Sequence, residues 1–444
     1  MGKNNGYLLL AAVVCAVGVG CATPGSGSAD VPQSGDPMVA EEQPEMSQVG
    51  AAPFQRVVTG YFIQWGIYGR AYHVWDIPAE HLSHLLYAFA EVGEDHTITL
   101  LDPWADVDNP FPDSPLNDQE ILSSLDFRGN FAQLVLLKHA YPHLKTLISV
   151  GGWTKSGRFS DMAATEQGRR SFAESCAAFV MKYQFDGIDI DWEYPVGGGL
   201  PENSARPEDR ENYTLMMEAI RKALDGAEEK TGKEYLLTGA TSADLEKIAN
   251  IEFDKVHRIM DYIYVMAYDL AGGWSQQTNH QAPLFFNPDQ HSRAQELDLP
   301  AQPEHYTVSA AIRGYLDAGV PPEKLVLGVP FYGRGWYTEP GLEDGMFQKV
   351  TDPLPQGTWE PGAWDYDDIK ANHQRPETYR MDQKAMASYL YNPETGLVIS
   401  YDSPEIMERK AEFVVDQGLG GMMFWEITQD RDLDLISIIS RMMQ

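Results

Sequence analysis

The chain has 444 residues with 65 acidic and 33 basic side chains, which gives a formal net charge of −32. This surplus argues against nucleic-acid binding, since a phosphate backbone is bound by clustered lysines and arginines, and it suits a neutral or weakly cationic ligand. Hydrophobic residues make up 43% and aromatic residues 11%, which excludes disorder throughout. The length fits two or three average domains, or one large α/β barrel with insertions.

The first residues have the features of an export signal. Lys3 precedes an apolar run from Tyr7 to Val19 that ends in small residues. Because this run is shorter than the roughly 20 residues needed to cross a bilayer, we predict a signal peptide over residues 1–20. The protein is therefore expected at the cell surface, in the outer membrane or outside the cell.

Cys21 follows Gly18-Val19-Gly20, which resembles the processing site of bacterial lipoproteins. The pattern departs from that site at Gly18, where leucine is usual. We expect lipidation at Cys21; ordinary cleavage near Ala22 and a buried N-terminal helix are the alternatives. A lipid anchor would be the only contact with a membrane.

Residues 21–53 are rich in Pro, Gly, Ser, Glu and Gln without periodicity, and we predict a flexible acidic linker. Cys176 lies in Arg169–Gln184, where apolar residues recur at helical spacing. It is expected to be a small buried side chain rather than a reactive thiol.

From residue 54 to residue 444, short apolar runs alternate with helical patterns. The predicted strands are Val57–Phe62, Leu85–Ala90, Lys145–Val150, Gly187–Trp192, Tyr235–Ala240, Tyr262–Ala267, Lys324–Val329 and Gly421–Trp425. The predicted helices are Asn130–Tyr141, Ala163–Gln184, Pro207–Lys230, His305–Ala318 and Pro404–Gln417. This alternation predicts parallel pairing, and eight such units close a (β/α)₈ TIM barrel with its active site at the carboxyl ends of the strands. An open doubly wound sheet is the structural alternative.

Three connections are too long to be plain turns: Val92–Asp126, Gly272–Glu304 and Trp336–Leu397. Loops of this length in a compact fold are usually functional. We predict that residues 336–397 form a small α+β insertion between strands seven and eight, which makes one wall of a cleft.

The segment from Asp186 to Glu193 carries the chemical signal. Asp189, Asp191 and Glu193 recur at period two, so a strand would place all three on one face, with isoleucines and a tryptophan on the other. Like charges this close raise pKa values, and a carboxyl kept protonated near neutral pH is what a general acid requires. Asp186 is out of phase with the three and is expected to make structural hydrogen bonds.

Two other interpretations of these carboxylates are open. A divalent cation would accept such oxygen ligands, although the run lacks a calcium-loop pattern and a strand wraps poorly around an ion. A solvated charged edge would leave the alternating apolar residues without a buried side. We favour paired-carboxylate catalysis without a metal or cofactor.

Five motifs follow one another along the chain: Ser149-Val150-Gly151-Gly152, Asp186-Gly187-Ile188-Asp189-Ile190-Asp191-Trp192-Glu193, Met266-Ala267-Tyr268-Asp269, Gly328-Val329-Pro330-Phe331-Tyr332-Gly333-Arg334-Gly335-Trp336 and Gly420-Gly421-Met422-Met423-Phe424-Trp425-Glu426. In this order they resemble the motifs of glycoside hydrolase family 18, the retaining chitinases. The longest insertion resembles that of the bacterial chitinase-A-like subfamily.

The resemblance implies four catalytic residues. Glu193 would be the general acid, and the substrate's own 2-acetamido oxygen would attack the anomeric carbon. Asp191 would orient the acetamido group and stabilise the cation, and Asp189 would share its proton. Tyr268 would hydrogen-bond the acetamido oxygen.

Sugar rings stack on flat apolar side chains, and aromatic residues near strand ends are expected to bind them. By resemblance Trp425 would floor the subsite where the bond breaks. The other expected substrate-binding residues are Trp153, Tyr61, Phe89, Met266, Asp269, Tyr332, Arg334, Trp274 and Gly152. Trp104, Trp359 and Trp364 fit a binding role and a core role equally well. The glycines after strand three fit a simple turn or a close approach of backbone to substrate.

The sequence thus predicts an exported, monomeric chitinase that cleaves β-1,4 bonds between N-acetylglucosamine units of chitin or chitooligosaccharides with retention. The alternatives are an endo-β-N-acetylglucosaminidase that acts on the core of N-glycans and a non-catalytic chitin-binding lectin. The presence of Glu193 speaks against the lectin.

Overall fold

A computed structural model describes residues 54–444. The predicted signal peptide over 1–20, the lipidation site Cys21 and the linker 21–53 lie outside the described residues and stay predictions. Among the described helices, none is long and apolar enough to span a membrane.

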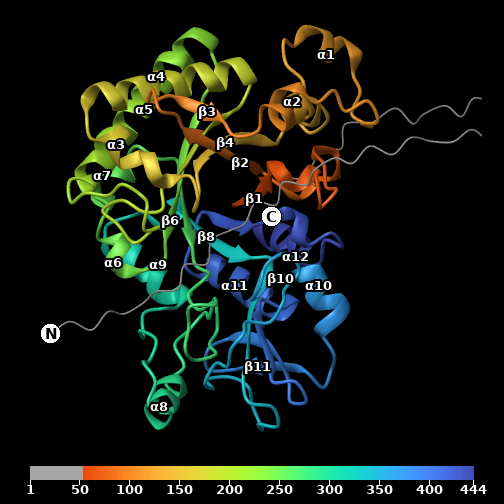
Figure 1. Ribbon diagram of the computed structural model, residues 1–444. Coiled ribbons are helices and arrows are strands. Elements are labelled where there is room, and N and C mark those ends of the chain that lie inside the picture. Colours follow the sequence, from red (N-terminus) through yellow and green to blue (C-terminus); the bar gives the residue numbers. More distant parts are fainter. Residues whose placement is uncertain (1–53) are drawn as a thin grey trace, which may run out of the picture. The chain divides into compact units, whose positions relative to one another are not determined.

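Eight parallel strands form a closed barrel (Figure 1), which confirms the predicted (β/α)₈ fold. Strand β1 pairs with both β2 and β14, so the sheet has no free edge within the barrel. All eight runs predicted as strands are barrel strands. In chain order they are β1 (Val57–Ile63), β2 (His84–Val92), β4 (Lys145–Gly151), β5 (Gly187–Asp191), β6 (Leu236–Ser242), β7 (Tyr262–Met266), β8 (Leu325–Pro330) and β14 (Gly421–Trp425).

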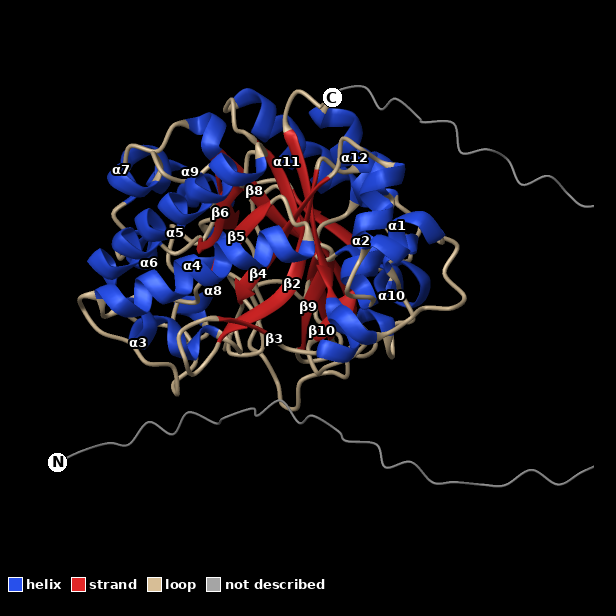
Figure 2. Ribbon diagram, turned by 90° about the horizontal axis from the view of Figure 1, so that it is seen from above, coloured by secondary structure: helices blue, strands red, loops and turns tan. Residues whose placement is uncertain are grey.

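Helices surround the barrel strands in the view from above (Figure 2). They are α1 (Gln119–Ser124), α2 (Gly129–Ala140), α3 (Phe159–Ala163), α4 (Glu166–Tyr183), α5 (Asp209–Thr231), α6 (Leu245–Ile248), α7 (Phe253–Val256), α8 (Asp289–Glu296), α9 (Val308–Asp317), α10 (Tyr366–Asp368), α11 (Pro404–Asp416) and α12 (Asp434–Met443). The helix predicted over Ala163–Gln184 is divided, because the Thr165 side chain accepts a hydrogen bond from the N–H of Gly168 and caps the start of α4.

The two faces of β5 meet different surroundings. Ile188, Ile190 and Trp192 point outward into the buried layer between strands and helices, where Trp192 stacks on Phe159 with ring centroids 5.3 Å apart. Cys176 on α4 is buried in the same layer, as predicted. The outward apolar packing holds the strand rigidly, and its alternate side chains face the barrel interior.

A five-stranded antiparallel sheet lies between β8 and β14 in the chain, in the order β10-β9-β13-β12-β11. Its strands are β9 (Tyr332–Tyr337), β10 (Ala363–Asp365), β11 (Tyr379–Asp382), β12 (Ala387–Asn392) and β13 (Leu397–Tyr401). The sheet therefore extends past both ends of the expected range 336–397, because β9 begins at Tyr332 and β13 ends at Tyr401. A short strand β3 (Ile98–Leu100) pairs with β2 inside the first long connection.

The connection after β7 packs against this insertion sheet. The Gln281 side chain donates hydrogen bonds to the carbonyls of Tyr332 and Ser400, at 2.6 and 3.3 Å. On α8 of the same connection, Asp289 forms an ion pair with Lys384 at 2.6 Å, and in Figure 1 α8 lies on the same side of the barrel as β11. The second and third long connections thus pack against each other.

Candidate active site

Strand β5 places Asp189 inside the barrel. The neighbouring strands are in register with it, because Ser149 on β4 and Thr238 on β6 both pair with Asp189. Their hydroxyls each donate a hydrogen bond to its carboxylate at 2.7 Å, and the hydroxyl of Tyr61 donates a third at 2.9 Å. Burial raises the pKa of Asp189, and these three hydrogen bonds oppose the rise.

Asp191 is the last residue of β5 and is buried above Asp189. Its Oδ1 atom has no hydrogen-bond partner among the described residues. Burial raises the pKa of Asp191 well above its ordinary value, and the charges of Glu193 and Asp189 raise it further. An unpartnered buried oxygen next to two other carboxyls is suited to accept a hydrogen bond from a ligand.

Glu193 stands two residues beyond the strand and closes the row. Its backbone N–H donates to the Ser156 hydroxyl at 2.8 Å, and its carbonyl accepts from the Asn203 side chain at 3.2 Å. Burial raises the pKa of Glu193 to about 7; Tyr194 and Lys247 oppose the rise, and Asp269 adds to it. The carboxyl can therefore give and take a proton near neutral pH.

Tyr268 follows β7 and adds a hydroxyl to the carboxyl cluster. Burial raises its pKa well above the ordinary value, and Asp191, Asp269 and Glu193 are the largest of the charges that raise it further. The hydroxyl thus stays protonated and can act as a hydrogen-bond donor.

Aromatic rings cover the barrel mouth next to the carboxyls. Trp425, at the end of β14, stacks on Phe89 with centroids 5.7 Å apart and lies 5.3 Å from Tyr61. Met266 joins the same cluster at the end of β7. Tyr61 is only 1% exposed and its hydroxyl donates a hydrogen bond to Asp189, so it supports that carboxylate; its expected contact with a sugar stays a prediction.

Two glycines at the end of β4, Gly151 and Gly152, allow two chain segments to touch. A Cβ on Gly151, whose φ is +113°, would lie 2.2 Å from the carbonyl oxygen of Asp191, and one on Gly152 would lie 2.7 Å from the Phe89 ring. The N–H of Gly152 donates to the Asp191 carbonyl at 2.8 Å. The glycines therefore bring β4 against the end of the acidic strand.

Gly151→Ala is expected to lower the free energy of unfolding by about 2–4 kcal/mol, because both the backbone conformation and the contact with Asp191 become strained. Urea unfolding would measure the change. Gly226→Ala on α5 is the matched control, since nothing lies within 4 Å of an added Cβ there. It should raise stability by about 0.5–1 kcal/mol. An equal effect of the two changes would contradict the packing argument.

Arg334 on β9 links the insertion sheet to the barrel mouth. Its guanidinium binds both oxygens of Asp269, each at 2.8 Å, and lies over the rings of Tyr332 and Trp274 at 5.2 and 5.8 Å. Such a bidentate pair fixes both side chains. The four residues, all expected from the sequence, lie together on one side of the cluster.

The other tryptophans considered for sugar binding differ in how far their side chains are exposed to solvent. Trp153 and Trp274 are 47% and 65% exposed, so their rings are open to a ligand. Trp104 and Trp359 are exposed as well, whereas Trp364 is buried in the core. Asp186, as expected, is structural: it accepts a hydrogen bond from the N–H of Thr146 and forms an ion pair with Lys138, both at 2.9 Å.

Sequence reasoning missed a polar hub on the insertion. The carboxylate of Asp365 accepts hydrogen bonds from Arg70 at 2.5 Å, from the Trp359 indole at 2.8 Å and from Gln429 at 2.9 Å. The guanidinium of Arg70 also lies 4.8 Å from the Trp359 ring. Trp65, two residues after β1, is not among the predicted residues either; its ring is 42% exposed and lies 6.4 Å from that of Phe89, and its position at a strand end was a usable signal.

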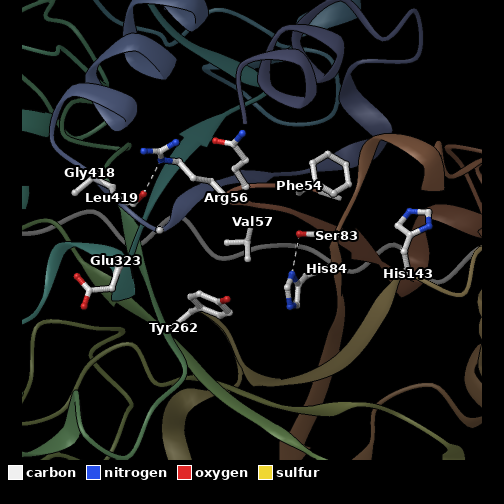
Figure 3. A pocket seen from close by; sticks show the side chains of 12 residues that line it. Phe54, Arg56, Val57, Ser83, His84, His143, Tyr262, Glu323, Gly418 and Leu419 are labelled. Carbon is white, nitrogen blue, oxygen red and sulfur yellow. Dashed lines mark hydrogen bonds between the residues drawn. The ribbon is translucent and has the colours of Figure 1, made fainter. Parts of the chain in front are cut away.

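A pocket of about 730 Å³ lies at the opposite end of the barrel (Figure 3). Its lining includes Val57, His84 and Tyr262, which are the first residues of β1, β2 and β7. Burial lowers the pKa of His84 to about 4, so its imidazole is neutral. This pocket contains none of the carboxyls of β5, and the N-terminal face of such a barrel usually serves stability.

No group of three or more histidine, cysteine or acidic side chains in residues 54–444 is arranged to hold a metal ion.

The family model of glycosyl hydrolases family 18 matches residues 57–430. The chain belongs to this family.

Two chitinase sequences align with most of the chain. Chitinase A1 of Niallia circulans is 42% identical over 410 residues, covering 85% of this chain and 57% of that protein. Chitinase 1 of Aphanocladium album is 35% identical, covering 84% of this chain and 81% of that protein. The chain thus spans little more than half of Chitinase A1.

Two solved structures are also similar over most of the chain. Chitinase ChiA74 from Bacillus thuringiensis is 39% identical with a TM-score of 0.77, covering 84% of this chain and 66% of that chain. A family 18 N-acetylglucosaminidase from Paenibacillus barengoltzii is 30% identical with a TM-score of 0.69, covering 87% and 99%.

Proposed function

We propose that this chain is a chitinase that hydrolyses β-1,4 bonds between N-acetylglucosamine units with retention. The observation that carries the proposal is the row Asp189, Asp191 and Glu193, which rises from the barrel interior to its mouth and ends in a carboxyl with a pKa of about 7. The chitinases among its relatives support the choice of substrate.

In the proposed first step, Glu193 protonates the glycosidic oxygen and the substrate's acetamido oxygen attacks the anomeric carbon. The C–O bond to the leaving sugar breaks, and a cyclic oxazolinium ion forms. Because the nucleophile belongs to the sugar itself, the attack is intramolecular, which can supply several kcal/mol of the barrier. Glu193, now ionised, then accepts a proton from the water that opens the ring with net retention.

Asp191 and Tyr268 act on the acetamido group in this scheme. The unpartnered Oδ1 of Asp191 accepts the acetamido N–H, and its negative charge stabilises the oxazolinium ion. Tyr268 donates to the acetamido oxygen and holds it below the anomeric carbon. Asp189 shares the proton of Asp191 and holds it while Asp191 carries the negative charge, which eases the repulsion among the three carboxyls.

The sugar at the cleavage point is proposed to stack on Trp425, which the neighbouring rings of Phe89 and Tyr61 hold in place. One side of that subsite is formed by Arg334, Asp269 and Tyr332, and Trp274 lengthens this side. Trp153 offers an exposed ring after β4. The arrangement suits an extended chain of pyranose rings with apolar faces.

The proposal predicts that cleavage requires the N-acetyl group. Purified protein is incubated with an N-acetylglucosamine hexamer, with the fully deacetylated hexamer and with a glucose hexamer of the same linkage, and products are followed by mass spectrometry. We expect the acetylated hexamer to react at least about 10³-fold faster, because only it contains the internal nucleophile. Equal rates on all three would overturn the proposal.

Two other functions would give different outcomes in the same experiment. An enzyme that acts on the core of N-glycans would release the glycan from a glycopeptide faster than it cuts the hexamer. A chitin-binding lectin would retain the hexamer without releasing any product.

A further inference from the structure

Lys247 is a half-buried cation beside the row of carboxyls. It lies on α6, after β6, and its ammonium nitrogen is 4.2 Å from the ring centroid of Tyr194, the residue that follows Glu193. Within residues 54–444 it forms no ion pair or hydrogen bond, and the Tyr194 ring is its close partner. A lysine placed in this way loses hydration without gaining a counterion, which calls for an explanation.

The stem of Lys247 packs under the segment that follows the catalytic carboxyl. Gly198 has a φ of +90°, and a Cβ at that position would lie 2.8 Å from Cε of Lys247. A Cβ on Gly199 would lie 2.0 Å from the carbonyl oxygen of Glu193, so the segment 194–199 folds back tightly on the end of β5. Lys247 therefore contacts both ends of this segment.

The charges around Glu193 are otherwise negative or already paired. Asp269 raises the pKa of Glu193, and the guanidinium of Arg334 is already paired, with Asp269 at 2.8 Å and with Glu360 at 3.5 Å. Lys247 is the cation that lowers the pKa of Glu193. Burial lowers the pKa of Lys247 itself, and three nearby acids oppose this: Asp244, Glu193 and Glu246.

We propose that Lys247 is a positioning residue for Glu193, which holds the segment 194–199 through the Tyr194 ring and faces the catalytic carboxyl with a positive charge. The inference rests on the proposed function, in which Glu193 is the general acid. The charge has a direct consequence for catalysis: it keeps Glu193 from binding its proton so tightly that donation to the leaving oxygen becomes slow.

The test is the pH profile of kcat/KM for a soluble N-acetylglucosamine oligomer, whose alkaline limb reports the general acid of the free enzyme. In the unaltered protein this limb is expected near pH 7, from the pKa of about 7 of Glu193. Lys247→Met keeps the stem and removes the charge. Since an ionised Glu193 then lacks its cation, the limb should move to higher pH by roughly 0.5–1 unit.

Lys247→Arg retains the charge and should leave the limb in place. Lys247→Gln is a second neutral side chain and should move it in the same direction as Met, which keeps the test available should Lys247→Met not fold. Lys255→Met on α7 is the matched control, because its ammonium is exposed and paired with Glu252.

A purely structural lysine would give lower rates with an unmoved limb in both neutral variants, and this result would overturn the inference. Failure of the proposed function is recognised separately, because the unaltered protein would then not cleave the oligomer at any pH. Thermal melting of each variant distinguishes lost folding from lost chemistry.

Discussion

Glu193→Gln is expected to lower kcat on an N-acetylglucosamine oligomer by roughly 10²–10⁴-fold, with KM changed by less than about threefold. The amide has the shape of the carboxyl but cannot donate an acidic proton to the glycosidic oxygen, and general acid catalysis typically contributes a factor of this size. The backbone contacts of Glu193 with Ser156 and Asn203 do not involve its carboxyl and should persist.

Steady-state kinetics on an unlabelled N-acetylglucosamine oligomer, with products followed by mass spectrometry, would measure the loss. An oligomer with a nitrophenyl leaving group offers a further check, because a nitrophenolate needs little protonation and this substrate should react with a much smaller deficit in the variant. Glu174→Gln on α4 is an exposed control that should behave as the unaltered protein. Full activity of Glu193→Gln on both kinds of substrate would remove the general acid from the scheme.

The second large effect is expected for Asp191→Asn, with kcat lowered by roughly 10²–10³-fold. The neutral amide cannot stabilise the positive charge that develops on the acetamido-derived ring. Its effect should be equally large for good and poor leaving groups, since Asp191 is proposed to act on the nucleophile and not on the departing oxygen. A deficit that depends on the leaving group would contradict that role.

The same variant should be more stable than the unaltered protein, and the difference should grow with pH. The folded-state pKa of Asp191 is raised by burial and by its two acidic neighbours, so its contribution to stability is greatest below its unfolded pKa and is lost as pH rises toward the folded value. Asparagine removes this dependence. Melting temperatures measured between pH 4 and pH 8 would reveal it; a variant that is less stable at every pH would contradict the argument.

The barrel and the acidic strand could be predicted because both follow from local patterns. Alternation of strand and helix determines parallel pairing, and period two in residues 187–193 determines which side chains face inward. The same pattern could not identify what surrounds them. The hydrogen bonds of Asp189 with Ser149 and Thr238 depend on the register of strands β4 and β6, which residues far apart in sequence decide together.

Other features depended on tertiary contacts for which one sequence gives no periodic signal. Asp365 lies nearly three hundred residues beyond Arg70, and only folding brings the two together. Lys247 lies outside every predicted strand and helix, and its packing against Tyr194 became evident only from the structure. Tyr61 is expected to line the cleft because it lies near a strand end, and only the structure shows that its side chain is buried on β1.

The ion pair between Asp269 and Arg334 and the hydrogen bonds of Gln281 join the insertion sheet to the connection after β7. Trimming residues 332–401 would leave one carboxylate without a counterion and one amide without acceptors at the mouth of the barrel. To adapt the proposed glycan-binding site to shorter or branched glycans, one should therefore exchange individual side chains such as Trp274 or Trp359 and keep the insertion sheet and the connection after β7.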